Sequence, residues 1–115
     1  MNKRDTEIMN ILGLAKEVIN SEEYDKIREK YKDPKQILLT PSGHRIITGH
    51  ALELAKRVIK YGGTDDEVKL SIINLYICMD ALKHQLNWGK FKRDNNINVL
   101  VRKYAVKAKE EKEKE

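Results

Sequence analysis

Hydrophobic residues in the first third of this chain recur every three or four positions, over about residues 5–19 and again over 22–32. This spacing is typical of helices with one buried side. Asp5 or Thr6 can cap the first helix, Ser21 can cap the second, and Asp33-Pro34 should end it. The expected core positions are Ile8, Ile11, Leu12, Ala15, Val18, Ile19, Tyr24, Ile27 and Tyr31.

A third helix is predicted to begin at Thr40-Pro41, after a connector over residues 35–39. Threonine is a good cap, and proline is favoured at the first helical position. The helix should run to about Tyr61, because Gly62-Gly63 can adopt the left-handed conformation that terminates helices. Its expected core face consists of Ile46, Ile47, Ala51, Leu54, Ala55, Val58 and Ile59.

The fourth helix should run from Asp65 to about Leu86 and is the most hydrophobic part of the chain. Thr64 and Glu67 have the spacing of a capping box, in which each side chain binds the backbone N–H of the other residue. Apolar residues lie almost all around this helix, so we expect it at the centre of the fold or at a homodimer interface.

Residues 87–96 read as a polar, basic linker, and Asp94 or Asn95 can cap a fifth helix. Ile97, Leu100, Val101 and Tyr104 give that helix one apolar stripe. A strand is the alternative for residues 97–109, because Val99, Val101 and Val106 are β-branched. Residues 110–115 consist of Glu and Lys and should form a solvated tail.

Together these elements predict an all-α protein: a compact bundle of four to five helices with a central apolar fourth helix. At 115 residues, one domain over 1–109 with a charged tail over 110–115 is expected. Cys78 is the only cysteine, so the chain can form no internal disulfide, and a reducing, cytoplasmic location is expected. The polar opening residues do not resemble a signal peptide, and no apolar run is long enough to span a membrane.

Net positive charge is concentrated near the C-terminal end of the chain, and this distribution suggests a function. Residues 1–80 carry 13 Lys and Arg against 13 Asp and Glu, whereas residues 81–109 carry eight Lys and Arg against Asp94 alone. The only Trp and the only Phe also lie in the basic stretch. A clustered basic segment with interleaved aromatic residues is typical of a polyanion-binding surface.

The sequence therefore indicates a nucleic-acid contact surface in the last third of the chain. Lysines and arginines would neutralise phosphates, and Trp88 or Phe91 would stack on exposed bases. The competing interpretation is that both rings cover one end of the bundle while the lysines keep it soluble. The candidate contact residues are Lys83, Trp88, Lys90, Phe91, Lys92, Arg93, Arg102, Lys103 and Lys107.

A weaker anion site is suggested at the start of the third helix. Free backbone N–H groups at a helix N-terminus favour an anion, and nearby side chains can add donors. The spacing is not that of a P-loop, so an ordinary capped helix start is the main alternative. The candidate residues are Thr40, Ser42, Gly43, His44 and Arg45.

A weak metal or acid–base site is also conceivable on the two long helices. His50 and Glu53 are three residues apart and Asp80 and His84 four apart, so each pair shares a helix face. If the helices are antiparallel neighbours, the four side chains would meet. The alternative is local pairing, of Glu53 with Lys56 or Arg57 and of Asp80 with its own neighbours.

Three functions remain open at this point. The first is a small non-enzymatic nucleic-acid-binding protein or regulator that needs no cofactor and contacts no membrane. The second is a regulator or inhibitor that docks its basic face on an acidic protein. The third is a small nucleotide- or metal-binding helical protein. A helix-turn-helix centred on Gly62-Gly63 is unfavourable, because Asp65, Asp66 and Glu67 at the start of its second helix would repel phosphates.

Overall fold

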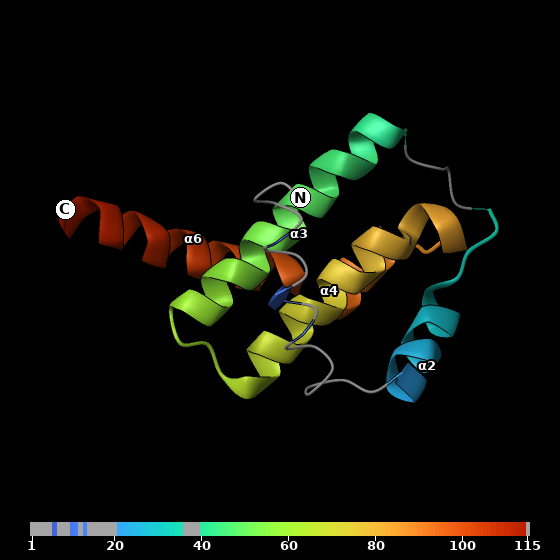
Figure 1. Ribbon diagram of the computed structural model, residues 1–115, viewed down its shortest axis with the longest axis horizontal. Helices are drawn as coiled ribbons and strands as arrows, with labels where there is room; N and C mark the ends of the chain where they lie inside the picture. Colours follow the sequence, from blue (N-terminus) through green and yellow to red (C-terminus); the bar gives the residue numbers. More distant parts are fainter. Residues whose placement is uncertain (1–5, 7–9, 12, 14–20, 36–39, 115) are drawn as a thin grey trace.

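The computed structural model describes residues 6, 10, 11, 13, 21–35 and 40–114, and these residues form a helical protein (Figure 1). The helices are α2 (Ser21–Tyr31), α3 (Pro41–Lys60), α4 (Asp65–His84), α5 (Trp88–Asp94) and α6 (Ile97–Lys114). Of the helix expected over about 5–19, Thr6, Asn10, Ile11 and Gly13 are described and are helical. The rest of that helix and residues 36–39 of the connector lie outside the described residues.

Helices α3 and α4 form a hairpin whose ends are set by the predicted caps (Figure 1). The Thr40 hydroxyl accepts a hydrogen bond from the Gly43 backbone N–H, and Thr64 and Glu67 form the full capping box. Gly62 has a φ of 69°, the left-handed conformation that turns the chain after α3. The local signals thus fix where both long helices begin and where α3 ends.

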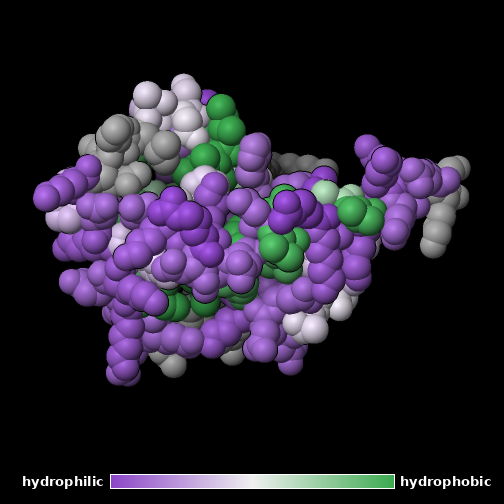
Figure 2. Space-filling view, turned by 180° about the vertical axis from the view of Figure 1, so that it is seen from behind, coloured by the Kyte–Doolittle hydropathy of each residue, from purple (hydrophilic) through white to green (hydrophobic). Residues whose placement is uncertain are grey.

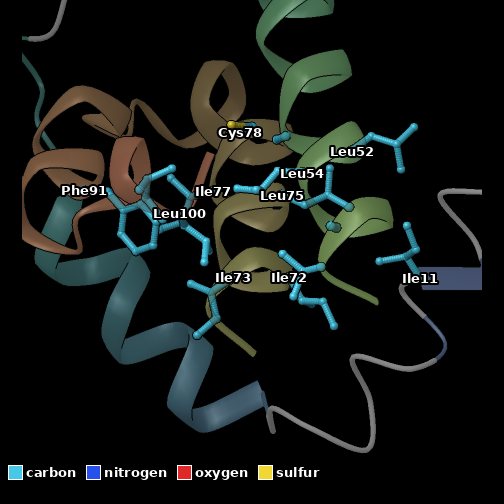
Figure 3. Close-up of a cluster of buried hydrophobic side chains, with 14 of the residues drawn as sticks. Ile11, Leu52, Leu54, Ile72, Ile73, Leu75, Ile77, Cys78, Phe91 and Leu100 are labelled. Atoms are coloured by element: carbon cyan, nitrogen blue, oxygen red, sulfur yellow. The ribbon is translucent and has the colours of Figure 1, made fainter. Parts of the chain in front are cut away.

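The core is built around α4, as its apolar character predicts (Figure 3). Every residue from Ser71 to Leu75 is buried, and so are Ile77, Cys78 and Ala81. Helix α3 covers one side of α4 with Ala51, Leu52, Leu54, Ala55 and Val58. The cluster is completed by Ile11, Tyr31, Leu86, Phe91, Ile97, Leu100 and Tyr104. The prediction of an all-α bundle with a central fourth helix is confirmed.

The prediction that residues 87–96 form a linker is wrong, because seven of them form helix α5. The Asn87 side chain caps it by accepting a hydrogen bond from the Lys90 backbone N–H at 3.0 Å. Phe91 then anchors it in the core, with only 2% of its surface exposed. A helix this short is unstable alone, so its apolar anchor and its cap hold it in place.

The last segment is helical through Lys114, so the strand alternative is also wrong. Its buried positions are Ile97, Leu100 and Tyr104, whereas Val101, predicted for the same stripe, is 40% exposed. Ile46 on α3 likewise leaves its predicted core face and is 59% exposed. Val101 lies at the edge of the stripe formed by Ile97, Leu100 and Tyr104, whereas Ile46 lies on the side of α3 opposite its buried residues, since helical residues advance by about 100° each.

Helix α6 is joined to the start of α4 by polar contacts. The Tyr104 hydroxyl donates to one oxygen of Glu67 at 2.9 Å, and Lys103 Nζ lies 2.8 Å from the other. Beyond them the C-terminal half of α6 projects from the body of the molecule, which is mainly hydrophilic from behind with small hydrophobic areas (Figure 2). No helix in the described part of the chain has the length and hydrophobicity needed to cross a membrane.

Candidate nucleic-acid interface

Phe91 does not belong to the contact surface that the sequence suggested. Its ring is buried and packs edge-on against Tyr31, with centroids 5.3 Å apart. A base stacked on Phe91 would require α5 to leave the core. The competing interpretation, in which this ring covers the bundle, is therefore correct for Phe91.

Trp88 is half-buried, and its orientation is fixed by a hydrogen bond. The indole Nε1–H donates to Asn74 Oδ1 at 2.8 Å, and Asn74 is 1% exposed. Lys92 Nζ lies 4.0 Å from the centroid of the indole ring, within the range of a cation–π contact. Trp88 thus remains partly accessible and carries a cation over its ring.

The candidate cations differ in how they are engaged. Lys103 forms an ion pair with Glu67, and Lys107 Nζ lies 5.4 Å from the ring of Tyr104. The contact with Glu67 raises the pKa of Lys103, and the Lys103 ammonium holds the pKa of Glu67 down at about 2. Within the basic stretch 81–109, the exposed cations without an ion pair to another described residue are Lys83, Lys90, Arg93, Arg102 and Lys109.

The predicted contact residues therefore do not share one face. Arg93 lies on the side of α5 opposite the buried Phe91, and Lys90 lies about 100° around the helix from Phe91, because helical residues advance by about 100° each. Arg102 lies on the outer side of α6, opposite the buried Ile97 and Leu100. Lys103 turns toward the start of α4 instead. The sequence located the basic segments of the chain but not the side from which each cation projects.

The end of α2 adds cations that the sequence analysis missed. The backbone N–H of Asp33 donates to the Gln85 carbonyl at 2.9 Å, and that of Asn87 donates to the Tyr31 carbonyl at 2.8 Å. These bonds bring the exposed Lys30 and Lys32 beside the junction of α4 and α5. The basic end of α2 was missed because residues 1–80 were counted together and have no net charge. Arg28, Lys30 and Lys32 nevertheless follow one another closely in the sequence.

Asp94, the one acid of the basic stretch, is engaged by Tyr31. The Tyr31 hydroxyl donates to Asp94 Oδ2 at 3.0 Å, and Asn95 Nδ2 donates to the same hydroxyl at 3.4 Å. Burial and the hydrogen bond to Asp94 raise the pKa of Tyr31.

We define the basic surface as the exposed cations Lys30, Lys32, Lys83, Lys90, Arg93, Arg102 and Lys109.

The start of α3 is an ordinary capped helix. Thr40 already binds the Gly43 N–H, and Pro41 has no N–H to offer an anion. His44 Nε2 donates to the Cys78 carbonyl at 2.7 Å, which ties that side chain to α4. The Gly43 N–H and the His44 ring are thus already engaged, and the anion site suggested for Thr40, Ser42, Gly43, His44 and Arg45 stays a prediction.

The suggested metal site also does not form. Glu53 lies 3.3 Å from Arg57 and 3.8 Å from Lys56, the local pairing proposed as the alternative. Asp80 accepts a short hydrogen bond from the Tyr24 hydroxyl of α2. Burial and this bond raise the pKa of Tyr24. No group of three or more potential metal ligands is found within the described residues, so His50, Glu53, Asp80 and His84 do not assemble.

The remaining arrangement is suited to binding a polyanion on the outer sides of consecutive helices. The cations that project there are held by a folded scaffold, since α5 and α6 are anchored by Phe91, Ile97, Leu100 and Tyr104. The chain matches no protein-family model, no curated protein and no solved structure with which it was compared.

Proposed function

We propose that this protein binds nucleic acid, without catalysing a reaction, through the basic surface formed by the ends of α2 and α4 and the outer sides of α5 and α6. The phosphate backbone is the polyanion, and its counterions are released as lysines and arginines replace them. The described residues bring together no metal-ligand cluster.

The observation that carries the proposal is that Lys90, Arg93 and Arg102 are exposed and unpaired among the described residues. Several cations elsewhere are opposed by acids: Lys26 by Glu22, Lys69 by Glu23, and Arg57 by Glu53. A folded surface that keeps its cations free of internal partners is available to an external anion.

An acidic protein is the second candidate partner, because Val99 and Val106 lie exposed beside Arg102 on α6. A phosphate backbone does not require apolar contacts, whereas protein interfaces combine charge with apolar area. This alternative predicts that the purified protein does not bind nucleic acid and that it co-purifies with another protein after nuclease treatment.

The test compares two double variants that remove the same charge. Lys90→Ala with Arg93→Ala removes two cations from the basic surface, whereas Lys26→Ala with Lys69→Ala removes two that are paired with acids. Binding of a labelled single strand and of its duplex is measured by fluorescence anisotropy at salt on the order of 50 mM. The first variant should bind at least about tenfold more weakly than the second.

Equal losses in the two variants would show that only net charge matters and would contradict the assignment of the surface. If the unaltered protein bound neither the single strand nor the duplex, the proposal that it binds nucleic acid would be wrong. Thermal unfolding of each variant shows whether a change in binding reflects a change in folding.

A further inference from the structure

A groove of about 400 Å³ lies where α3, α5 and α6 meet over α4. Leu54 and Arg57 of α3 form one wall, and Ile97 and Val101 of α6 form another. Trp88 and Lys92 of α5 close a third side, and Asn74 of α4 contributes to the lining. The groove therefore borders the basic surface and contains the only tryptophan of the chain.

The Trp88–Asn74 pair gives this groove both a planar and a polar contact. Asn74 uses its carbonyl to hold the indole N–H, and its side chain makes no other hydrogen bond among the described residues. A primary amide has two N–H donors. No fully buried side-chain nitrogen or oxygen of the described residues lacks a partner, so we infer that these donors reach the groove.

Positive charge lines the same groove. Lys92 Nζ lies 4.0 Å from the indole centroid and has no ion pair among the described residues. Glu53 also lines the groove, but Lys56 and Arg57 balance its charge. Arg102 lies one turn beyond Asn98, which lines the groove from α6. A ligand that fits would combine a flat ring for Trp88, acceptors for Asn74 and an anionic group for Lys92.

We propose that this groove holds one unpaired nucleotide of a single strand, with its base against Trp88 and its phosphate on Lys92. The inference rests on the proposed function and makes it specific, because a paired base lies inside the duplex stack and cannot enter a groove. Lys92 moves from the indole to the phosphate when the base takes its place. The protein thus prefers single-stranded over duplex nucleic acid.

The fluorescence of Trp88 reports directly on this groove, since the chain has no other tryptophan. The protein is titrated with an unlabelled mixed-sequence 12-nucleotide single strand, and separately with the duplex of the same sequence. The affinity is measured by the fluorescence anisotropy of a labelled copy of the same nucleic acid. Occupation of the groove is measured by the change in Trp88 emission. The single strand should quench Trp88 and bind at least about tenfold more tightly than the duplex.

Val101→Phe fills the groove without changing any charge, and Val99→Phe is the matched control on the exposed side of the same helix. Val101→Phe should weaken single-strand binding about tenfold and abolish quenching, while Val99→Phe should change neither. Equal affinities for single strand and duplex, unaltered Trp88 emission and no effect of Val101→Phe would contradict nucleotide binding in the groove. These results would still be compatible with binding of nucleic acid by the basic surface. No binding of either form by the unaltered protein would overturn both.

Discussion

At the scale of single residues, three hydrogen bonds between side chains join α4 to the helices around it. Trp88 binds Asn74, Tyr24 binds Asp80, and Tyr104 binds Glu67. Each bond joins α4 to a different helix, so each fixes the orientation of one neighbour. None of these pairs is visible in the sequence, since the partners are from 14 to 56 residues apart.

Trp88→Phe should lower the free energy of unfolding by about 1–3 kcal/mol, because the buried Asn74 carbonyl loses the one donor that it has among the described residues. Urea unfolding followed by circular dichroism measures this change. Lys92→Ala is the control, since it removes only the cation above the ring and should cost about 0.5–1 kcal/mol. Equal effects of the two substitutions would contradict the role given to the hydrogen bond.

Glu67 should make stability depend on acid pH. Its pKa is lowered to about 2 in the folded protein, first by Lys103 and then by the Thr64 backbone N–H. A lowered folded pKa means that the stabilisation is complete above the ordinary value of 4.5 and is lost as pH falls toward about 2. The unfolding midpoint of the unaltered protein should therefore fall over this range.

Glu67→Gln should remove much of that acid dependence and destabilise the protein at neutral pH, because Gln cannot pair with Lys103. Thermal unfolding at several pH values between 2 and 7 measures both effects. Glu22→Gln is the control, since the Glu22–Lys26 pair is exposed on α2. The same acid dependence in the unaltered protein and in Glu67→Gln would contradict this account.

At the scale of helices, the sequence predicts what local chemistry controls. Thr40-Pro41 and the Thr64–Glu67 capping box placed the starts of α3 and α4 correctly. Helix α5 was missed, because seven residues are too few to show a periodic pattern and its stability comes from the insertion of Phe91. The exposure of Val101 was missed because its coverage depends on how neighbouring helices are placed. The exposure of Ile46 was missed because the expected core face was drawn too wide, since Ile46 lies opposite the buried residues of α3.

The turn between α3 and α4 offers a test of helix docking. A Cβ atom on Gly63 would lie 2.6 Å from Val58 Cγ1 and 2.7 Å from the Tyr104 hydroxyl, so Gly63→Ala should push α6 away from α3. Gly62→Ala meets no atom within 4 Å and should cost about 1–2 kcal/mol through its positive φ alone. Hydrogen exchange should increase in α6 for Gly63→Ala but not for Gly62→Ala.

Similar exchange of α6 in both glycine variants would show that the Gly63 contact does not hold α6. Global unfolding measured alongside separates local loosening of α6 from a general loss of stability.

At the scale of the whole molecule, function depends on how charge is divided between surfaces. The net charge of +5 is modest, yet the acids gather in pairs and in the C-terminal tail. The sequence showed that the basic residues are clustered along the chain. It did not show that Lys103 is engaged by Glu67, that Phe91 is buried, or that α2 contributes Lys32, since these depend on the packing of distant segments.

Removing residues 110–115 should tighten nucleic-acid binding a few-fold, because this segment carries four Glu and two Lys. The deletion raises the net charge from +5 to +7 and releases Lys60 from Glu111. Anisotropy titrations of both chains at equal salt measure the effect. Weaker binding by the shortened chain would mean that the end of α6 contributes contacts of its own.

The central claim is that the basic surface binds a phosphate backbone, and the salt dependence of binding tests it most directly. The affinity for a labelled single strand is measured by anisotropy over a series of salt concentrations. The logarithm of the affinity should fall linearly with the logarithm of salt, and Lys90→Ala with Arg93→Ala should reduce the slope by about 0.7 for each lost phosphate contact. No binding at the lowest salt, or a slope unchanged by this double variant, would contradict the account.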